Sequence, residues 1–228
     1  EGEVLPHERA TEGPFGEYTG YRSSSVGTPQ PVYRVKAVTH RRNPILTVSC
    51  MGVPVDDAAA TMHIRLNADL IETLRDRGFP VKTVYLPFEC VNSLLVVSTK
   101  TPYPNIAKRI AHAVWGSQAG SHIYYVVVVD EDVDATNMSE VLHALATKCH
   151  PYRGIYRVPN APVLPVVCTF LDPEDRPTGD NGAYALFDCT WPTRWRKEDT
   201  PVKASFDVLW PEDIQKKVLE RWAEYGYK

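Results

Sequence analysis

The chain has 228 residues, a formal net charge of −3 and a hydrophobic content of 43%. This length is sufficient for one large domain or two small ones with a sizeable core. The near-neutral charge argues against a nucleic-acid or membrane-surface binder, and the longest apolar run, 126–129, is too short to span a bilayer. We therefore expect a globular protein with no nucleic-acid and no membrane partner.

The N-terminal sequence and the cysteines both predict a cytoplasmic protein. The first nine residues, "EGEVLPHER", are acidic and lack an apolar signal core. The cysteines are scattered and form no CxxC pair, a pattern typical of reduced thiols and unlike that of a zinc site. They are Cys50, Cys90, Cys149, Cys168 and Cys189.

The first 55 residues consist mainly of predicted strand and loop. The chain begins in the last part of a strand, and a loop rich in Gly, Ser and Pro follows through Pro31. Alternating and β-branched residues then predict strands over 32–41 and 45–50. This segment looks like part of a β domain that is separate from the rest of the chain.

From about residue 56, predicted strands alternate with predicted helices. The first helix, over 57–77, has Asp56 or Asp57 as its cap and an apolar stripe at helical spacing. The stripe is made of Ala59, Met62, Leu66, Leu70 and Leu74. Further strands are predicted over 81–88, 94–100, 123–129, 163–170 and 184–190, and further helices over 104–116, over 139–149 and from Pro211 onward. The alternation indicates an α/β layer architecture, with the all-apolar strand 123–129 covered on both faces.

The acidic run "DEDVD" over 130–134 invites a metal-binding interpretation. A strand end followed by a helix cap explains it better, because Thr136 or Asn137 can cap the next helix and Glu140 supplies a first-turn acid. We therefore predict no metal site in this run.

The stretch "TEGPFGEYTGY" over 11–21 combines two carboxylates with turn residues. Gly13, Pro14 and Gly16 forbid a helix, so the loop must turn, and Glu12 and Glu17 can approach one point from two sides. Two carboxylates in an apolar setting can hold and release a proton near neutral pH. On spacing alone, however, a surface loop with two solvated glutamates is the more common arrangement.

Further segments carry a resemblance that changes this balance. In chain order, the segments are "EGPFGEYTGY", "VTHRRNPIL", "PFE", "VVVVDEDVD", "LHALATKCHP", "FDCTWPTRW" and "WPEDIQKKVLERWAEYGY". Together they resemble the UbiD family of prenylated-FMN-dependent decarboxylases. Family members are about twice as long, so the chain resembles their C-terminal half. The resemblance implies the end of a flavin-binding split β-barrel over 1–55 and an α/β oligomerisation domain with a C-terminal helix over 56–228.

The resemblance also implies catalytic roles for the two glutamates. Glu17 resembles the proton donor, which delivers the proton that replaces CO₂. Glu12 resembles the glutamate that pairs with a catalytic arginine. That arginine and the ligands of the metal that holds the flavin phosphate lie in the N-terminal half of family members, so no residue of this chain is expected to bind metal.

Substrate-binding positions are implied in two further segments. His63 lies one step off the apolar stripe of its helix and can reach a phenolic hydroxyl, whereas Met62 lies on the stripe and can simply pack in the core. Ala161 and Val163 are small and suit a substituted aromatic ring. Gln118 stands where some members have a cofactor-binding lysine, so its cofactor role is open.

The implied activity is the non-oxidative, reversible decarboxylation of a hydroxybenzoate-type acid, such as protocatechuate, gallate or vanillate. Prenylated FMN is the implied cofactor, with a divalent metal (Mn or Mg) and K bound through the N-terminal half. The implied partners are that half, the small aromatic acid and further copies of the chain in a dimer or hexamer. One alternative is a decarboxylase of α,β-unsaturated, cinnamate-type acids. Another is a non-catalytic assembly subunit, or a stable C-terminal fragment that is inactive by itself.

Overall fold

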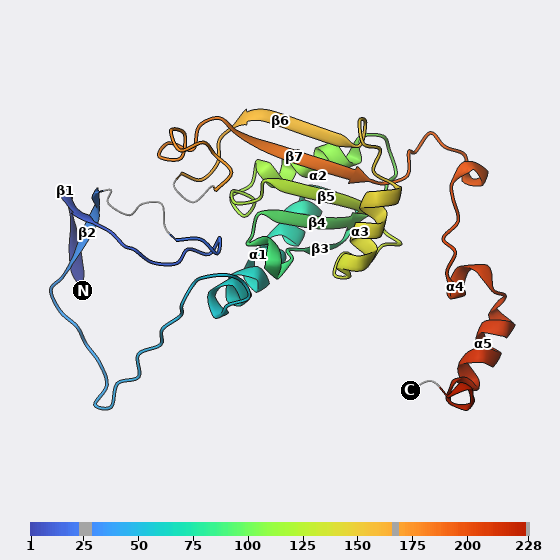
Figure 1. The fold of residues 1–228 in the computed structure, drawn as a ribbon, viewed down its shortest axis with the longest axis horizontal. Helices are drawn as coiled ribbons and strands as arrows, with labels where there is room; N and C mark the ends of the chain where they lie inside the picture. Colours follow the sequence, from blue (N-terminus) through green and yellow to red (C-terminus); the bar gives the residue numbers. More distant parts are fainter. Residues whose placement is uncertain (23–28, 166–168, 227–228) are drawn as a thin grey trace. The chain divides into compact units, whose positions relative to one another are not determined.

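A computed structural model describes residues 1–22, 29–165 and 169–226. The chain divides into two compact units, Glu1–Thr190 and Trp191–Lys228. The first unit contains a two-stranded sheet and a five-stranded sheet (Figure 1). Its elements are β1 (Gly2–Thr11), β2 (Pro29–Val35), α1 (Asp57–Asp76), β3 (Val81–Tyr85), η1 (Phe88–Cys90), β4 (Leu94–Thr99), α2 (Ile106–Trp115), β5 (Tyr125–Asp130), α3 (Met138–Thr147), β6 (Ile155–Ala161) and β7 (Gly182–Cys189).

The five-stranded sheet has the order β3-β4-β5-β7-β6, which Figure 1 shows as a continuous twisted layer. The three central strands β4, β5 and β7 run parallel, and the edge strands β3 and β6 pair antiparallel with their neighbours. Parallel neighbours need a crossover connection, and the segment containing α2 supplies it between β4 and β5. The predicted α/β architecture is confirmed.

The central strand β5 is covered on both faces, as its all-apolar sequence predicts. Successive side chains of a strand point to opposite faces. Val126 and Val128 accordingly join the core cluster that contains buried residues of α1 and α2, whereas Val127 and Val129 join the cluster that contains residues of α3. At about 25 cal/mol per Å² of apolar surface, burial on both faces makes this strand a main source of stability.

Side-chain caps fix where two of the helices begin. Asp56 is the N-cap of α1, and its side chain accepts a hydrogen bond from the amide of Ala59 at 2.8 Å. Asn137 caps α3 by accepting from the amides of Ser139 and Glu140. Each of these side chains satisfies amides that have no partner within the helix. Of the two N-cap candidates predicted for each helix, Asp56 and Asn137 are therefore the residues that cap it.

The segment between β2 and α1 differs from the prediction. The strand predicted over 32–41 ends at Val35, and 45–50 forms no strand. Ile45 and Leu46 are exposed. In the part of the chain that the structure describes, the two-stranded sheet consists of β1 and β2 alone. An apolar, β-branched run has a strand's preference, but without a neighbouring strand its backbone groups have no ladder partners.

The strand predicted over 163–170 is also misplaced. The strand beside β7 is β6, whereas 162–165 is irregular and 166–168 lies outside the described residues. Pro159 and Asn160 hide the strand pattern of β6 from a sequence-based prediction, because both residues normally interrupt strands. They are accommodated because β6 lies at the sheet edge and its register shifts between Pro159 and Ala161.

The described cysteines are free thiols, as the sequence predicts. Cys149 and Cys189 are buried, Cys90 is half-buried and Cys50 is exposed, whereas Cys168 lies outside the described residues. Burial is the main cause of the raised pKa of both Cys149 and Cys189. These two thiols therefore act as core residues, which stay protonated and unreactive.

The second unit, Trp191–Lys228, is built of short helical pieces. They are η2 (Lys197–Asp199), α4 (Phe206–Leu209), α5 (Glu212–Glu220) and η3 (Trp222–Tyr225). Helix α5 begins directly after Pro211, as predicted, whereas the four-residue α4 was not predicted. Apolar side chains of this unit stay exposed within the chain, among them Leu209, Trp210, Leu219 and Trp222. No helix in the described residues is both long and apolar enough to cross a membrane.

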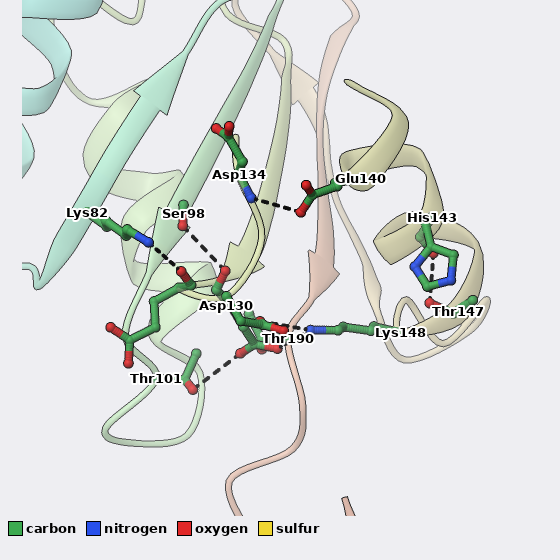
Figure 2. A network of polar contacts seen from close by, with 12 residues as sticks. Lys82, Ser98, Thr101, Asp130, Asp134, Glu140, His143, Thr147, Lys148 and Thr190 are labelled. Atoms are coloured by element: carbon green, nitrogen blue, oxygen red, sulfur yellow. Dashed lines mark hydrogen bonds and ion pairs between the residues drawn. The ribbon is translucent and has the colours of Figure 1, made fainter. Parts of the chain in front are cut away.

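A polar network closes the C-terminal end of β5 (Figure 2). Lys148 Nζ lies 3.0 Å from Asp130 Oδ2 and 3.3 Å from Asp132 Oδ1. The Lys148 and Asp130 side chains are only 9% and 14% exposed. Thr101 donates a further hydrogen bond to the Asp130 carboxylate at 3.5 Å. The acidic run thus acts here as a partner for a buried lysine and as the approach to the α3 cap.

We predict that Lys148→Met destabilises the protein by about 3 kcal/mol, because the Asp130 carboxylate then stays buried without its cation. Urea unfolding of the two proteins measures the difference. The matched control is Lys100→Met, since Lys100 forms a long 4.0 Å pair with Glu131 in which both side chains are exposed. This control should change stability little. Equal effects of the two substitutions would contradict the prediction.

Candidate active site

The loop that carries the two glutamates is a compact turn. Gly16 and Arg22 form an isolated antiparallel bridge. Inside it, the Glu17 amide donates to the Tyr21 carbonyl and the Gly20 amide donates to the Glu17 carbonyl, both at 2.9 Å. Glu17 and Glu12 are both half-buried in this chain. The predicted turn is confirmed, and the joint action of the two carboxylates stays a prediction.

Two glycines allow this loop to pack closely against the segment that leads into α1. A Cβ atom at Gly16 would lie 2.3 Å from the carbonyl oxygen of Met51, a distance that no side chain tolerates. Gly20 has a φ of +81°, and a Cβ atom there would lie 3.3 Å from Val53 Cα. The loop therefore needs glycine at both positions to approach the backbone of 51–53.

Asp56 connects that segment to the helix. Its Oδ1 accepts from the Ala59 amide within α1, and its Oδ2 accepts from the Gly52 amide at 3.3 Å. The glutamate loop packs against the same stretch of backbone. The loop, the segment before α1 and the first turn of α1 are thus linked in one continuous set of contacts.

A second contact joins the loop to the segment before β5. The Tyr18 ring meets the His122 ring edge to face, with centroids 5.9 Å apart. The pKa of His122 is lowered, first because burial disfavours the charged ring and second because Arg65 of α1 is nearby. His122 was not predicted as a site residue, since a single histidine in a short polar turn carries no periodic signal.

His63 is buried in the first half of α1, with 1% of its surface exposed. Its ring stacks almost parallel on Phe88, with centroids 4.8 Å apart and planes 7° apart. Within the described residues, neither ring nitrogen has a hydrogen-bond partner. Burial lowers the pKa of His63, and the Leu86 backbone and Asn92 side chain act in the opposite direction. The ring is therefore a neutral imidazole in largely apolar surroundings.

The positions of His63 and Met62 differ from the expectation. His63, with Ala59 and Leu66, belongs to the buried stripe of α1, whereas Met62 is only half-buried and packs at the border of the core. The Met62 sulfur accepts a hydrogen bond from Asn92 Nδ2 at 3.1 Å. An imidazole can take a core position on a helix because its ring stacks like an aromatic side chain, which the apolar count does not register.

The other predicted substrate residues occupy a different cluster. Ala161 and Val163 are both buried. Val163 packs with Tyr124 and Leu171, and a Cβ atom at Gly182 would lie 2.5 Å from Val163 Cγ1. His63 packs against Phe88 instead. A joint role of these residues in binding one substrate stays a prediction.

Gln118 is exposed in the turn after α2. Its backbone carbonyl accepts from the Ser121 amide at 3.3 Å, which helps to shape the approach to β5. A cofactor role for its side chain stays a prediction. Among the described residues, no group of three or more His, Cys, Asp and Glu is arranged to hold a metal ion.

Two family models match successive parts of the chain. Residues 1–54 match the Rift-related domain of 3-octaprenyl-4-hydroxybenzoate carboxy-lyase (UbiD), and residues 60–189 match the C-terminal domain of the same family. Pyrrole-2-carboxylic acid decarboxylase of Pseudomonas aeruginosa is 32% identical over 235 residues, which cover 100% of this chain and 47% of that protein. Phenolic acid decarboxylase of Bacillus subtilis is 36% identical over 181 residues, covering 78% of this chain and 37% of that protein. The chain therefore spans about half, or less, of the length of these relatives.

Solved structures give the same result. The closed form of vanillic acid decarboxylase from Sedimentibacter hydroxybenzoicus matches with a TM-score of 0.80 and 29% identity, over 100% of this chain and 45% of that chain. The UbiD-class enzyme HmfF from Pelotomaculum thermopropionicum, in complex with FMN, matches with a TM-score of 0.70 and 29% identity, over 90% of this chain and 43% of that chain. From the family models, which account for nearly all of the first unit, and from these matches, we conclude that the chain belongs to the UbiD family of carboxy-lyases.

Proposed function

We propose that this chain is the C-terminal half of a prenylated-FMN-dependent decarboxylase that acts reversibly on a hydroxybenzoate-type acid. Residues 1–55 would complete the flavin-binding domain, and residues 56–228 would form the oligomerisation domain. The names of the similar proteins, which describe decarboxylases of phenolic, pyrrole and vanillic acids, support an aromatic substrate. The observation that carries the choice of a phenolic acid is the buried, neutral His63, whose ring nitrogens have no partner in the described part of the chain.

The proposed partner is the N-terminal half that family members possess. Ile45, Leu46 and Val48 are between 72% and 84% exposed. Exposed apolar runs of this kind are typical of surfaces that another segment covers. That half would also supply the catalytic arginine and the ligands of a divalent metal and K.

The residues present fit one side of a flavin site. They provide two half-buried carboxylates on a turn and exposed apolar side chains beside it. Structures of HmfF contain FMN or prenylated FMN. When bound, prenylated FMN supplies the electron sink that loss of CO₂ requires. Glu17 would then deliver a proton to the carbon that carried CO₂, and Glu12 would orient the arginine of the N-terminal half.

His63 would recognise the hydroxyl group of the substrate. A neutral imidazole nitrogen accepts a hydrogen bond from a phenol and can take its proton. A buried polar group without a partner costs about 1–3 kcal/mol, so a ligand that satisfies it gains over one that does not. This reasoning favours a hydroxybenzoate over a cinnamate-type acid, for which a wholly apolar pocket near residue 63 would be more suitable.

A non-catalytic assembly subunit, or an inactive C-terminal fragment, is the second candidate. The exposed Trp210, Leu219 and Trp222 of the second unit favour it, because such side chains are common at subunit interfaces. These residues serve equally well in an enzyme that forms a dimer or hexamer. The two candidates differ in whether the complete assembly releases CO₂.

We predict that Glu17→Gln lowers kcat for decarboxylation by about 10²-fold or more in the complete assembly loaded with prenylated FMN, because the amide cannot donate the required proton. The measurement is CO₂ release from a panel of hydroxybenzoates and cinnamates. Glu72→Gln, an exposed position on α1, is the matched control and should retain full activity. Unchanged turnover in Glu17→Gln would remove Glu17 from the mechanism. Absence of CO₂ release in the unmodified assembly would favour the assembly subunit.

We predict that His63→Phe selectively impairs turnover of hydroxylated acids. Phenylalanine preserves the stacking on Phe88 but removes both ring nitrogens. We expect kcat/KM to fall by about 10²-fold or more for a hydroxybenzoate and to change little for an acid without a ring hydroxyl. Steady-state kinetics on such a pair of acids provide the test. Equal losses of kcat/KM on both acids would show that His63 supports the fold and does not recognise the ring hydroxyl.

A further inference from the structure

His122 lies in a turn that is fixed to the body of the α/β sheet just before β5. Backbone hydrogen bonds close this turn, from the Gly120 amide to the Ser117 carbonyl at 3.2 Å and from the Ile123 amide to the Gly120 carbonyl at 3.0 Å. Gly120 packs so closely against the end of α2 that a Cβ atom there would collide with the Val114 carbonyl oxygen. Ile123, the residue after His122, is only 1% exposed. The packing of the sheet and α2 therefore determines where His122 lies.

The His122 ring is itself restrained by two neighbours. Its Nδ1 lies 3.0 Å from the Ser121 hydroxyl oxygen. The ring is half-buried, and burial is the main cause of its lowered pKa, so it is uncharged at neutral pH. An uncharged imidazole packs against other rings as an aromatic side chain does. Tyr18 makes such a contact with it, with an interplanar angle of 68° at the centroid distance of 5.9 Å.

Tyr18 is the residue directly after Glu17 in the glutamate loop. The backbone hydrogen bonds of Glu17 to Tyr21 and Gly20 close the turn around it, so the position of the Tyr18 ring is tied to the position of the Glu17 backbone. The glycine contacts of this loop are made with 51–53, which belong to no helix or strand. His122, by contrast, gives the loop a contact with a turn that adjoins a buried strand.

We propose that His122 is a positioning residue for the glutamate loop: through its ring contact with Tyr18, it fixes where the Glu17 carboxylate lies. The inference rests on the proposed function for the role of Glu17 as proton donor, whereas the Tyr18–His122 contact is independent of that role. A proton donor must lie within reach of the reacting carbon, and a displacement of about 1 Å can lower a rate by about 10²-fold. Loss of the ring contact should therefore affect turnover more than substrate binding.

Three substitutions isolate this ring contact. His122→Ala removes the ring, whereas His122→Phe keeps an aromatic ring and removes the two nitrogens. The matched control is His112→Ala, because His112 of α2 also meets aromatic rings edge to face, those of Trp115 in α2 and Tyr156 in β6. Fluorine-19 NMR of the full chain labelled with 3-fluorotyrosine reports the surroundings of each tyrosine ring. Tyr18→Phe identifies the Tyr18 signal among those of 12 tyrosines.

With His122→Ala, we expect the Tyr18 signal to shift and to narrow, because the Tyr18 ring loses its neighbour and gains mobility. His122→Phe should restore the broader line, since an aromatic ring again restrains Tyr18. His112→Ala should leave the Tyr18 signal as it is. This measurement requires neither cofactor nor substrate. If His122→Ala leaves the shift and the width of the Tyr18 signal unchanged, His122 does not restrain the loop and the inference is wrong.

Activity of the complete assembly loaded with prenylated FMN tests the positioning role. We expect His122→Ala to lower kcat on a hydroxybenzoate by about 10-fold or more and to change KM by less than about 2-fold. His122→Phe should recover most of the lost turnover, and His112→Ala should retain all of it. Full turnover of His122→Ala, or a loss that His122→Phe does not relieve, would overturn the positioning role. An assembly that decarboxylates no acid, while the NMR changes appear as expected, would refute the proposed function and support the Tyr18–His122 contact.

Discussion

The structure depends on one constraint: the parallel strands β4 and β5 must be buried on both faces. Val126–Val129 of β5 satisfy it by sending alternate side chains to opposite sides, toward α1 and α2 on one side and toward α3 on the other. Because α1 must lie against the sheet, its buried stripe is fixed, and His63 belongs to that stripe. The polar candidate residue is therefore held by the same packing that holds the core together. At the C-terminal end of β5, Asp130 forms an ion pair with Lys148.

Much of the α/β body could be predicted from the sequence, because its signals are strong. The period over 57–77 predicts a helix, and the apolar run of β5 predicts a strand because it is short and rich in valine. The segment 45–50 has an equally good strand pattern and forms none, since pairing depends on a neighbour that lies elsewhere in the fold. The edge strand β6 was missed for the opposite reason. Pro159 and Asn160 look like breakers, and only an edge position with a register shift accommodates them.

The candidate site was predictable where turn chemistry or resemblance marks it. The Gly and Pro residues of the opening loop predict the turn that contains Glu17, and resemblance alone singles out His63. The burial of His63 was not predictable from an apolar count, because stacking on Phe88 makes an imidazole act as a core residue. Asn92 has no sequence signal at all. Its positive φ, and its buried Oδ1 without a hydrogen-bond partner among the described residues, are both properties of three-dimensional arrangement.

The two hydrogen bonds of Asp56 restrict which amino acids can occupy that position. Serine, threonine and asparagine are ordinary alternatives at a helix N-cap, but each offers a single acceptor oxygen. Asp56 uses one oxygen for the Ala59 amide and the other for the Gly52 amide. A substitution that would be harmless at most helix starts would here detach the segment that supports the glutamate loop. The choice of residue at one helix cap thus determines whether the segment beneath the glutamate loop stays bonded to the first turn of α1.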